Sequence, residues 1–482
     1  MPEFIEEILI DCVRSIPDEI AFSTTSAKWS YSNVLVNSLK IANLLKKLKV
    51  SKEEKIGIYF DNNEEFIFSM FGILLIGGIV VPIPFHSKAQ EISALIKNCD
   101  IKVCLCKNKP AEVNGYWINT STIDFYNTDI NLVLKDKDYT AKSSDAAFFL
   151  STSGSTGTPK VIMLSHQNII SNTIAHSIQV AFKRNDLFLI TMPLHFSSTI
   201  TTQILSCIYL KVPFLLVSVP MLPKVFFNIA ESFNVSCLAA VPTFLSVLVR
   251  DNLNSVFFNK VHTLIISGSA IQNNMMEKIK LLFPNVDVLH TYGLTEASPR
   301  VTIMKRGEEK ISCGFPVPGV DVEIVDKSGS TLINNSIGEI KVKGKNIMLG
   351  YYKNEYLTNT NIVNGWLLTG DLGYFDSDGR LFVVGRIKNL ILTGGINVYP
   401  EEVEEFFYGI NGIEEALVLG EPDEIMGEII TAHLVINDQI TLNEIKNITF
   451  RALSNYKNPR KWYLHDSLPK TLTGKIKRNQ FN

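Results

Sequence analysis

Alternating strand-like and helix-like segments constrain the fold of this chain more than any other feature of its sequence. Residues 55–60 (KIGIYF), 79–83 (IVVPI) and 101–106 are short apolar runs that predict strands, and residues 64–75 and 89–97 between them predict helices. Repetition of this kind predicts a mainly parallel sheet that is covered by helices. The pattern continues in four further segments that predict strands of a second sheet: residues 187–192, 214–218, 237–241 and 263–267.

The length and texture of the chain predict more than one domain. The chain has 482 residues, which is too long for one compact core. From about residue 312, short strands alternate with turn signals such as DKSGS and DSDGR. The composition changes at Arg386, because no Lys or Arg occurs between residues 389 and 445. We therefore expect an α/β N-terminal domain at residues 1–385, with a smaller β lobe at about 312–385, and a small α+β C-terminal domain at residues 386–482.

The composition excludes several classes of partner. Lys and Arg number 46 and Asp and Glu number 48, so the net charge of −2 gives no electrostatic case for binding nucleic acid or an anionic membrane. The seven cysteines form no CxxC pair, which favours reduced thiols and a cytoplasmic protein. The N-terminus carries acidic residues before most of its apolar ones and does not resemble a signal peptide.

Two apolar stretches, residues 66–85 and 187–210, are long enough to be compared with membrane spans. Gly72 and Pro82 interrupt the first stretch, and Pro193 interrupts the second. Buried helices and strands are therefore favoured over stable membrane insertion.

The segment with the clearest chemistry is FFLSTSGSTGTPKVIML, residues 148–164. An apolar strand enters a Ser/Thr/Gly loop that ends at Lys160, and a second apolar strand leaves it. Glycines allow a backbone to approach an anion closely, hydroxyl and amide groups donate hydrogen bonds, and lysine supplies charge. These are the requirements of a triphosphate-binding loop. The spacing opposes a Walker A loop, because Thr158 and Pro159 separate Gly157 from Lys160.

A second candidate segment is DVLHTYGLTEASPR, residues 287–300. A strand is expected to end at His290, just before Tyr292 and Gly293. Tyr292 offers a flat face to a nucleobase. Glu296 offers hard oxygen ligands of the kind that Mg²⁺ takes beside substrate phosphates, although a surface acid explains Glu296 alone equally well.

Two further segments lie towards the C-terminus. In GWLLTGDLGYFDSDGRLFVVGRIK, residues 365–388, Asp371 is expected in a tight turn, where its carboxylate can accept hydrogen bonds from ribose hydroxyls with Arg386 as an added donor. In LPKTLTGKIKR, residues 468–478, Lys475 can bring a point charge to a reacting phosphoryl group. Taken singly, these groups are also explained by a hairpin acid, a strand-end arginine and a basic tail.

Together and in this order, the segments resemble the adenylate-forming superfamily, which contains acyl-CoA synthetases, adenylation domains of peptide synthetases and firefly luciferase. The resemblance runs from Trp29-Ser30-Tyr31 to Lys475 and rests on STSGSTGTPK, TYGLTE, GWLLTGDLGYFDSDGRL, GRIKNLI and PKTLTGKIKR. It implies that a carboxylate attacks the α-phosphate of ATP, which yields an acyl-adenylate and pyrophosphate. A thiol then attacks the acyl carbon and AMP leaves. Both reactants of the first step are anionic, so Mg²⁺ and lysine must offset their repulsion.

The resemblance also implies a role for each matching residue. The catalytic set is Lys475, Thr295 at the α-phosphate, Glu296 as the Mg²⁺ ligand, and Lys388 as the hinge of a mobile C-terminal domain. The nucleotide-binding set is Thr152, Ser153, Gly154, Ser155, Thr156, Gly157, Lys160, Gly268, Ser269, Ala270, His290, Thr291, Tyr292, Gly293, Asp371 and Arg386. The substrate pocket is formed by His195, Phe196, Ser197, Thr199, Val241, Pro242, Gly293 and Leu294. The tunnel for a pantetheine thiol is lined by Gly394 and Gly395.

The stretch after Pro193, PLHFSSTITTQIL, bears on the acid. Amino-acid-activating relatives place an Asp here to pair with the substrate ammonium, and this chain has none. A buried ammonium without a partner is costly, so we expect a neutral aliphatic or aromatic acid. Thr199 stands where many acyl-activating relatives have glycine, and it would shorten a pocket that it faces. Ile271 stands where many relatives have proline.

The sequence leaves the acceptor and the oligomeric state open. NVYPEEVE and LSNYKNPR resemble acyl-CoA ligases, yet stand-alone ligases that load an acyl or peptidyl carrier protein share these features. Lys457, Arg460 and Lys461 suit either a CoA phosphate or an acidic carrier protein. The expected cofactors are ATP, Mg²⁺ and CoA or a phosphopantetheinyl carrier protein. A non-catalytic nucleotide-binding relative is the remote alternative, and the intact Lys475, Glu296 and phosphate loop oppose it.

Overall fold

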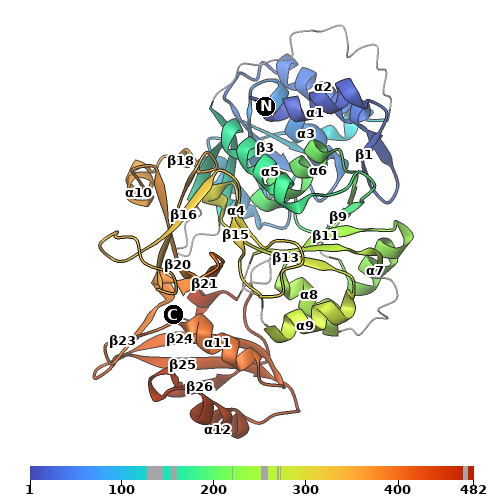
Figure 1. Ribbon diagram of the computed structural model, residues 1–482. Coiled ribbons are helices and arrows are strands. Elements are labelled where there is room, and N and C mark those ends of the chain that lie inside the picture. The colour runs from blue at the N-terminus through green and yellow to red at the C-terminus, as the bar shows by residue number, and fades with distance from the viewer. Residues whose placement is uncertain are drawn as a thin grey trace.

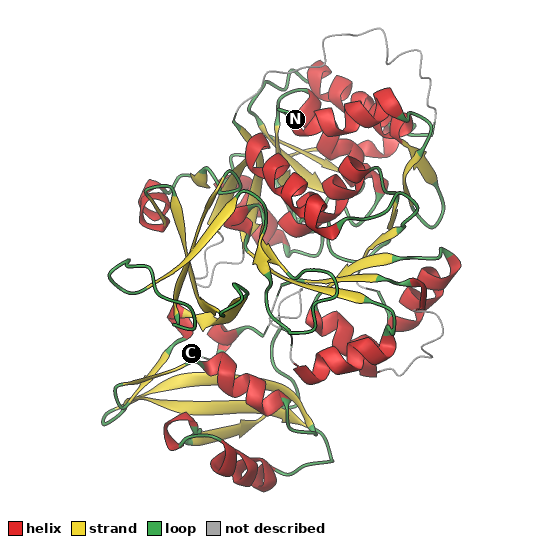
Figure 2. Cartoon of the chain, viewed as in Figure 1, coloured by secondary structure: helices red, strands yellow, loops and turns green. Residues whose placement is uncertain are grey.

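The computed structural model describes residues 1–126, 145–152, 160–219, 221–250, 259–268, 271, 273–470 and 476–481. A large N-terminal body lies above a small C-terminal one (Figure 1), and both contain helices packed on sheets (Figure 2). The strands form four sheets, of nine, seven, five and five strands. The expected α/β architecture, with two parallel-rich sheets, a β lobe and a small C-terminal domain, is confirmed.

The first sheet has the strand order β15-β14-β13-β12-β11-β9-β10-β1-β2. Its central strands, from β13 to β1, are parallel, and β2, β14 and β15 add antiparallel edges. Its strands are β1 (Ile20–Ser23), β2 (Lys28–Ser30), β9 (Phe188–Ile190), β10 (Phe214–Leu216), β11 (Cys237–Ala240), β12 (Thr263–Ile266), β13 (Asp287–Gly293), β14 (Arg300–Ile303) and β15 (Phe315–Pro316).

The second sheet has the strand order β18-β8-β7-β4-β3-β5-β6. Strands β7, β4, β3, β5 and β6 are parallel, and β8 and β18 are antiparallel to their neighbours. Its strands are β3 (Lys55–Tyr59), β4 (Ile79–Pro82), β5 (Val103–Cys106), β6 (Tyr116–Asn119), β7 (Ala146–Thr152), β8 (Lys160–Ser165) and β18 (Gly350–Tyr351). Thr152 of β7 pairs with Lys160 of β8, which confirms that two strands bracket the Ser/Thr/Gly loop.

Helices separate and cover these two sheets because successive strand residues face opposite layers. In β9, Phe188 and Ile190 join the core between the sheets, whereas Leu189 joins the core on the outer face. The inner layer consists of α1 (Ile5–Ser15), α2 (Tyr31–Lys47), α3 (Glu64–Leu75), α5 (His166–Val180) and α6 (Ser206–Leu210). The outer layers are α7 (Pro223–Ser232), α8 (Pro242–Arg250) and α9 (Asn273–Leu282) on the first sheet, and α4 (Ala89–Asn98) on the second.

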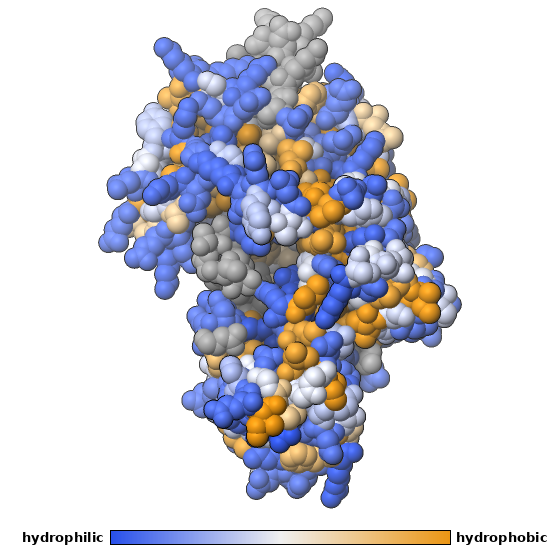
Figure 3. Space-filling view, turned by 90° about the vertical axis from the view of Figure 1, so that its left-hand side faces the viewer, coloured by the Kyte–Doolittle hydropathy of each residue, from blue (hydrophilic) through white to orange (hydrophobic). Residues whose placement is uncertain are grey.

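The two long apolar stretches are buried in these layers, as expected. The first forms α3 and β4, and a Cβ on Gly72 would lie 2.7 Å from Cβ of Ile41, so glycine permits close packing of α3 on α2. The second forms β9, a π-helix (Thr199–Leu205) and α6. Within the described part of the chain, no helix has the length and apolar character needed to cross a membrane. On the face in Figure 3, hydrophilic residues cover most of the surface, and apolar residues form separate patches between them.

The third sheet forms the predicted β lobe and the fourth sheet forms the C-terminal domain. The lobe consists of β16 (Val320–Val325), β17 (Gly338–Gly344), β19 (Ile362–Val363), β20 (Trp366–Phe375) and β21 (Leu381–Arg386), with α10 (Glu355–Asn361). The C-terminal domain consists of β22 (Ile391–Thr393), β23 (Ile396–Val398), β24 (Ile413–Asp423), β25 (Gly427–Ile436) and β26 (Lys461–Leu464), with α11 (Pro400–Tyr408) and α12 (Leu442–Ala452). The boundary at residue 386 and the mobility of this domain stay predictions.

Two local expectations were wrong. Strand β13 does not end at His290 but continues to Gly293, because Thr291–Gly293 pair with β14 after the parallel pairing with β12 has ended. Asp371 does not lie in a tight turn. It lies within β20, where Gly370 adopts φ +70° without breaking the strand, and it pairs with Arg386 of β21. The seven cysteines are unpaired and buried, as expected for reduced thiols.

Candidate active site

The candidate active site lies at the carboxyl edge of the first sheet. The neighbouring parallel strands β11 and β12 end at Ala240 and Ile266, and β13 extends past them to Gly293. Gly268 has φ +98°, and a Cβ there would lie 3.3 Å from Cγ1 of Val241. The segments that follow β11 and β12 are thus in contact. Ligands of parallel sheets bind outside the carboxyl ends of the strands, so this edge is the natural position for a ligand.

Tyr292, Asp371 and Arg386 form one polar network that joins β13 to the β lobe. The Tyr292 hydroxyl donates to Oδ2 of Asp371 at 2.7 Å, and Nε of Arg386 lies 2.7 Å from Oδ1. Asp371 is only 4% exposed, whereas the Arg386 side chain is half exposed. Burial, and then the Asp371 charge, raise the pKa of Tyr292 well above its usual value, so the phenol stays neutral and donates. The carboxylate is therefore held firmly in an orientation suited to accepting further hydroxyl groups.

Glu296 contacts Tyr351 of β18, and Tyr351 in turn lies beside Lys160 of β8. The hydroxyl of Tyr351 donates to Oε1 of Glu296 at 3.1 Å, and Nδ2 of Asn361 donates to the same hydroxyl at 3.1 Å. Nζ of Lys160 lies 5.4 Å from the centre of the Tyr351 ring. Tyr351 was not expected from the sequence, because the GYY segment that contains it carries no motif of its own. Tyr351 therefore contacts the expected Mg²⁺ ligand and lies beside the last residue of the predicted phosphate loop.

Several cations lie near Asp371 of the β lobe. Lys388 lies in a short 3-10 turn (Ile387–Asn389) that follows β21 directly. Burial lowers the pKa of Lys388, and the nearby charges of Arg386, Lys160 and Arg478 lower it further. Arg386 is paired with Asp371 and Arg478 with Glu404, so among the described residues Lys160 and Lys388 are the cations here that can attract an anion. A triphosphate with its divalent cation fits such a donor set.

Part of the predicted site lies outside the described residues. This applies to Ser153, Gly154, Ser155, Thr156 and Gly157 of the phosphate loop, to Ser269 and Ala270 after β12, and to Lys475. For Thr152, only its place at the end of β7 is described. Pairing of Thr152 with Lys160 fixes where the loop leaves and re-enters the sheet.

Three predicted residues of β13 and its extension serve the local structure. Nδ1 of His290 lies 2.8 Å from the Ser312 carbonyl oxygen, and Oγ1 of Thr291 donates to the Ile266 carbonyl at 2.8 Å. Both side chains are buried. Thr295 opens a 3-10 turn (Thr295–Ala297) that presents Glu296, and Met348 anchors this turn because its N–H donates to the Glu296 carbonyl at 2.9 Å. The predicted nucleotide contacts of these residues stay predictions.

The predicted acyl pocket begins where β9 ends. The rings of His195 and Phe196 meet edge to face, with centroids 4.4 Å apart. Burial, and then the charge of His86, lower the pKa of His195 to about 4, so its imidazole is neutral. Ser197 and Thr199 are buried, and their hydroxyls have no hydrogen-bond partner among the described residues. Thr199 opens the π-helix, and such helices occur frequently at functional sites.

A buried arginine near this region was not expected. Arg300 of β14 is 3% exposed, and its Nε has no hydrogen-bond partner among the described residues. Asn172 of α5 holds its backbone from both sides, because the Asn172 amide donates to the Arg300 carbonyl at 2.7 Å and accepts from its N–H at 2.9 Å. Burial lowers the pKa of Arg300 to about 9, and its charge contributes to the lowered pKa of the buried His176 on α5. The one sequence feature that could have indicated this buried arginine is its position at the start of the apolar run that forms β14.

Gly394 and Gly395 form the tip of the β22–β23 hairpin. Their φ angles of +56° and +78° are those of a tight two-residue turn, which explains the glycine pair. A Cβ on Gly394 would lie 2.7 Å from Cε of Met426, whereas a Cβ on Gly395 would meet nothing within 4 Å. The role of the pair in admitting a thiol stays a prediction.

The cations and the two carboxylates at the carboxyl edge are a donor set that fits a nucleotide with its divalent cation. Family comparison is in agreement: residues 11–352 match the model for the AMP-binding enzyme family, and residues 402–475 match the model for the C-terminal domain of AMP-binding enzymes. The chain belongs to the AMP-binding enzyme family.

Individual relatives match nearly the whole chain. It is 27% identical to a 2-succinylbenzoate–CoA ligase of Bacillus cytotoxicus, over 96% of this chain and 95% of that protein. It is 26% identical to a long-chain-fatty-acid–CoA ligase of Bacillus subtilis, over 99% of this chain and 93% of that protein. Among solved structures, ATP-bound MatB from Rhodopseudomonas palustris matches with a TM-score of 0.89 and 23% identity, covering 100% of this chain and 98% of that one. The o-succinylbenzoate CoA synthetase MenE of Bacillus subtilis, in complex with the acyl-adenylate intermediate, matches with a TM-score of 0.86 and 23% identity, covering 98% and 97%.

Proposed function

We propose that this chain is an AMP-forming ligase that joins a carboxylic acid to CoA through an acyl-adenylate. The observation that carries the proposal is that Lys160, Arg386 and Lys388 lie near one another and near Asp371, while Tyr351 contacts Glu296 and lies beside Lys160. Family membership and relatives that are CoA ligases over nearly their full length support the same reaction. They do not favour a carrier protein as the acceptor.

We propose the following roles for the site residues. The phosphate loop with Lys160 would hold the β- and γ-phosphates, and Asp371 with Arg386 would hold the ribose. Gly268 and Tyr292 would flank adenine. Glu296 would hold Mg²⁺, which lowers the repulsion between phosphates and the incoming carboxylate. Lys475 would bridge the carboxylate and the α-phosphate as charge develops there.

The substrate is proposed to be a neutral aliphatic or aromatic carboxylic acid. Residues 193–205 contain no Asp or Glu to receive an ammonium group, and the His195 imidazole is neutral. An α-amino acid would therefore leave an unpaired charge in the pocket. The substrates of the relatives range from 2-succinylbenzoate to long-chain fatty acids, so they support the reaction more than a particular acid.

The C-terminal domain is proposed to begin near residue 386 and to turn about Lys388 between the two steps. Lys388 occupies a short turn between the last strand of the lobe and the first strand of the C-terminal domain. We further propose a cytoplasmic setting, where ATP and CoA are available and where seven buried, unpaired cysteines stay reduced.

The test is a coupled assay with ATP, Mg²⁺, CoA and a panel of acids, in which AMP and the free thiol of CoA are measured together. The proposal expects one AMP formed for each thiol lost, and only when an acid is present. Formation of AMP with no loss of thiol would contradict CoA as the acceptor. An absence of both, in protein that binds ATP, would contradict the ligase itself.

A further inference from the structure

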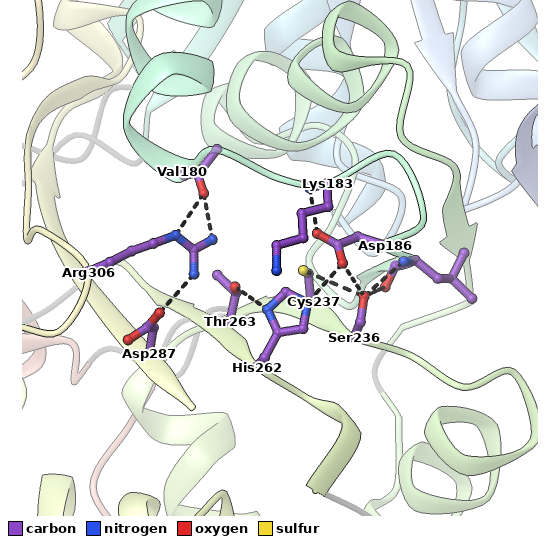
Figure 4. Close-up of polar contacts among 10 residues, drawn as sticks. Val180, Lys183, Asp186, Ser236, Cys237, His262, Thr263, Asp287 and Arg306 are labelled. Atoms are coloured by element: carbon purple, nitrogen blue, oxygen red, sulfur yellow. Dashed lines mark hydrogen bonds and ion pairs between the residues drawn. The ribbon is translucent and has the colours of Figure 1, made fainter. Parts of the chain in front are cut away.

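Three potential metal ligands meet at the amino edge of the first sheet, opposite the candidate active site. Asp186 precedes β9, Cys237 begins β11 and His262 precedes β12. Figure 4 shows the three side chains turned towards one another. One carboxylate oxygen, the thiol sulfur and one ring nitrogen all lie within 4.8 Å of one another. Asp186 and Cys237 are buried, at 3% and 0% exposure, whereas the side chain of His262 is 36% exposed.

The backbone around the cluster is rigid. The N–H groups of Ser236 and Cys237 donate to the Leu187 carbonyl at 3.1 and 3.2 Å, and the His262 N–H donates to the Ser236 carbonyl at 2.9 Å. These bonds join the starts of three adjacent parallel strands. The three donor side chains are therefore positioned before any ligand arrives, which lowers the conformational cost of binding one.

Two of the three donor groups, on His262 and Asp186, also have a neighbour that orients them. Nδ1 of His262 lies 2.9 Å from Oγ1 of Thr263, which leaves Nε2 directed at Asp186. The Lys183 N–H donates to Oδ2 of Asp186 at 2.7 Å, and this leaves Oδ1 facing the cluster. Metal-binding histidines and carboxylates in proteins are held by outer hydrogen bonds of this kind.

The carboxylate of Asp186 lacks a permanently charged partner among the described residues. Among the described residues, Asp186 pairs with no Lys or Arg side chain, and its only ion-pair partner is His262, with Nε2 2.8 Å from Oδ1. A divalent cation would be neutralised in full by one carboxylate and one thiolate, with imidazole as a neutral third ligand.

We propose that Asp186, Cys237 and His262 form a Zn²⁺ site that ties together the starts of β9, β11 and β12. Zn²⁺ takes oxygen, nitrogen and sulfur ligands in tetrahedral geometry, at bond lengths that place neighbouring ligand atoms roughly 3.4–3.6 Å apart. The aspartate–histidine contact is shorter than this, so both side chains separate by less than about 1 Å to admit the ion. The exposed edge of His262 leaves the fourth position to water. One thiol proton is released on binding.

The site is separate from the proposed ligase chemistry. The strands between the two edges are four residues long, or roughly 13 Å. The inference therefore does not rest on the proposed function, and its predicted effect is on stability and on metal binding.

Cobalt binding to the full-length protein tests the proposal. Protein that has been freed of metal by chelation and desalted receives Co²⁺ in the absence of nucleotide, and the near-ultraviolet thiolate-to-cobalt absorption is recorded. We expect one equivalent of Co²⁺ to produce this band. Cys237→Ser should lose it. Cys104→Ser, which alters an equally buried cysteine in the second sheet, should keep it. A wild-type protein without the band, or a Cys237→Ser variant that keeps it, would overturn the proposal.

Zinc affinity, measured by competition with a chromophoric chelator, provides a second test that does not depend on the buried cysteine. His262→Gln changes a side chain that is already one-third exposed, so folding should survive. We expect this variant to lose at least about tenfold in affinity for Zn²⁺ and to lose the zinc-dependent rise in melting temperature that the wild type shows. Equal zinc affinity of the variant and the wild type would reduce the cluster to a hydrogen-bonded aspartate–histidine pair and refute the site.

Discussion

The two edges of the first sheet carry different kinds of polar cluster. At the carboxyl edge, the functional groups come from contiguous segments such as TYGLTE, and glycines, hydroxyls and lysines lie next to one another in the chain. At the amino edge, Asp186, Cys237 and His262 come from three separate connections and share no motif. The parallel topology alone brings the three groups of the amino edge together. At the carboxyl edge, Lys160, Asp371 and Arg386 are supplied by the second and third sheets, and each lies in a recognisable segment of the sequence.

This contrast follows from what each edge has to do. A nucleotide is long and anionic, so whole loops must follow its outline with backbone N–H groups. A metal ion needs only three or four side-chain atoms, and any three strand ends can supply them. The predictions below test the difference between an edge that performs chemistry and an edge that stabilises the fold.

The largest effect is expected for Lys475→Ala. Removing the charge that the proposed transition state requires should lower acid-dependent pyrophosphate exchange at least about a hundredfold. Thioester formation from supplied acyl-adenylate should be spared, because the proposed domain rotation removes Lys475 before that step. The measurement is exchange and thioester formation side by side, with Lys477→Ala as the matched control in the same tail. Equal loss in both half-reactions would contradict this division of labour.

For Lys388→Pro we expect the opposite of the Lys475→Ala result: the transfer step is impaired rather than adenylation. Proline fixes the backbone angle φ near −65° and so restricts rotation at the proposed hinge. Adenylation should proceed as in Lys388→Ala, which loses the same charge, while transfer to CoA falls by at least about tenfold below that variant, a barrier change of roughly 1.4 kcal/mol. The same two half-reaction assays measure it, and Lys388→Ala, which keeps the backbone free, separates the hinge from the side chain. If both steps of the proline variant run at the normal rate, the hinge lies elsewhere.

Much of the fold and of the carboxyl edge was predictable because local pattern determined it. The residues of α3, Glu64–Leu75, are those that the apolar pattern predicted, and the strands around the phosphate loop follow the change from apolar to Ser/Thr/Gly. The extension of β13 beyond His290 was not predictable, because its partner β14 lies after an intervening turn. The contact of Tyr351 with Glu296 and the cluster at the amino edge also depend on residues brought together only by the tertiary fold.

A moderate effect on stability is expected for Arg300→Met. Arg300 is a buried charge, and its Nε lacks a partner among the described residues. Even a buried ion pair can be replaced by apolar side chains of similar volume with a gain of about 1–4 kcal/mol, because the desolvation penalty of the charges is removed. Arg300 forms no ion pair among the described residues, so its replacement should also be stabilising. Denaturant unfolding of the variant should show a higher free energy of unfolding. The control is Arg306→Met at the amino edge, whose guanidinium is paired with Asp287 at 3.0 Å and whose loss should not stabilise the protein. A less stable Arg300→Met protein would contradict the description of this charge as uncompensated.

The smallest effect concerns pH and His195. Its pKa is lowered to about 4 in the folded protein, against an ordinary value of 6.5. Between these two values the unfolded chain binds a proton that the folded chain does not, so the free energy of unfolding falls as the pH falls from 6.5 towards 4. The slope from one such group is at most about 1.4 kcal/mol per pH unit. His195→Asn should make the measured pH dependence shallower in this window. An unchanged slope would show that His195 titrates alike in both states.

The most direct test of the central claim is acid-dependent ATP–pyrophosphate exchange across a panel of carboxylic acids. The panel would contain short and long fatty acids, benzoates, cinnamates and amino acids. Exchange with one class of neutral acid, and its loss in Lys475→Ala but not in Arg306→Met, is the predicted result. Exchange with amino acids alone would contradict the neutral pocket. Exchange with no acid, in a protein that binds ATP, would contradict adenylation at the carboxyl edge.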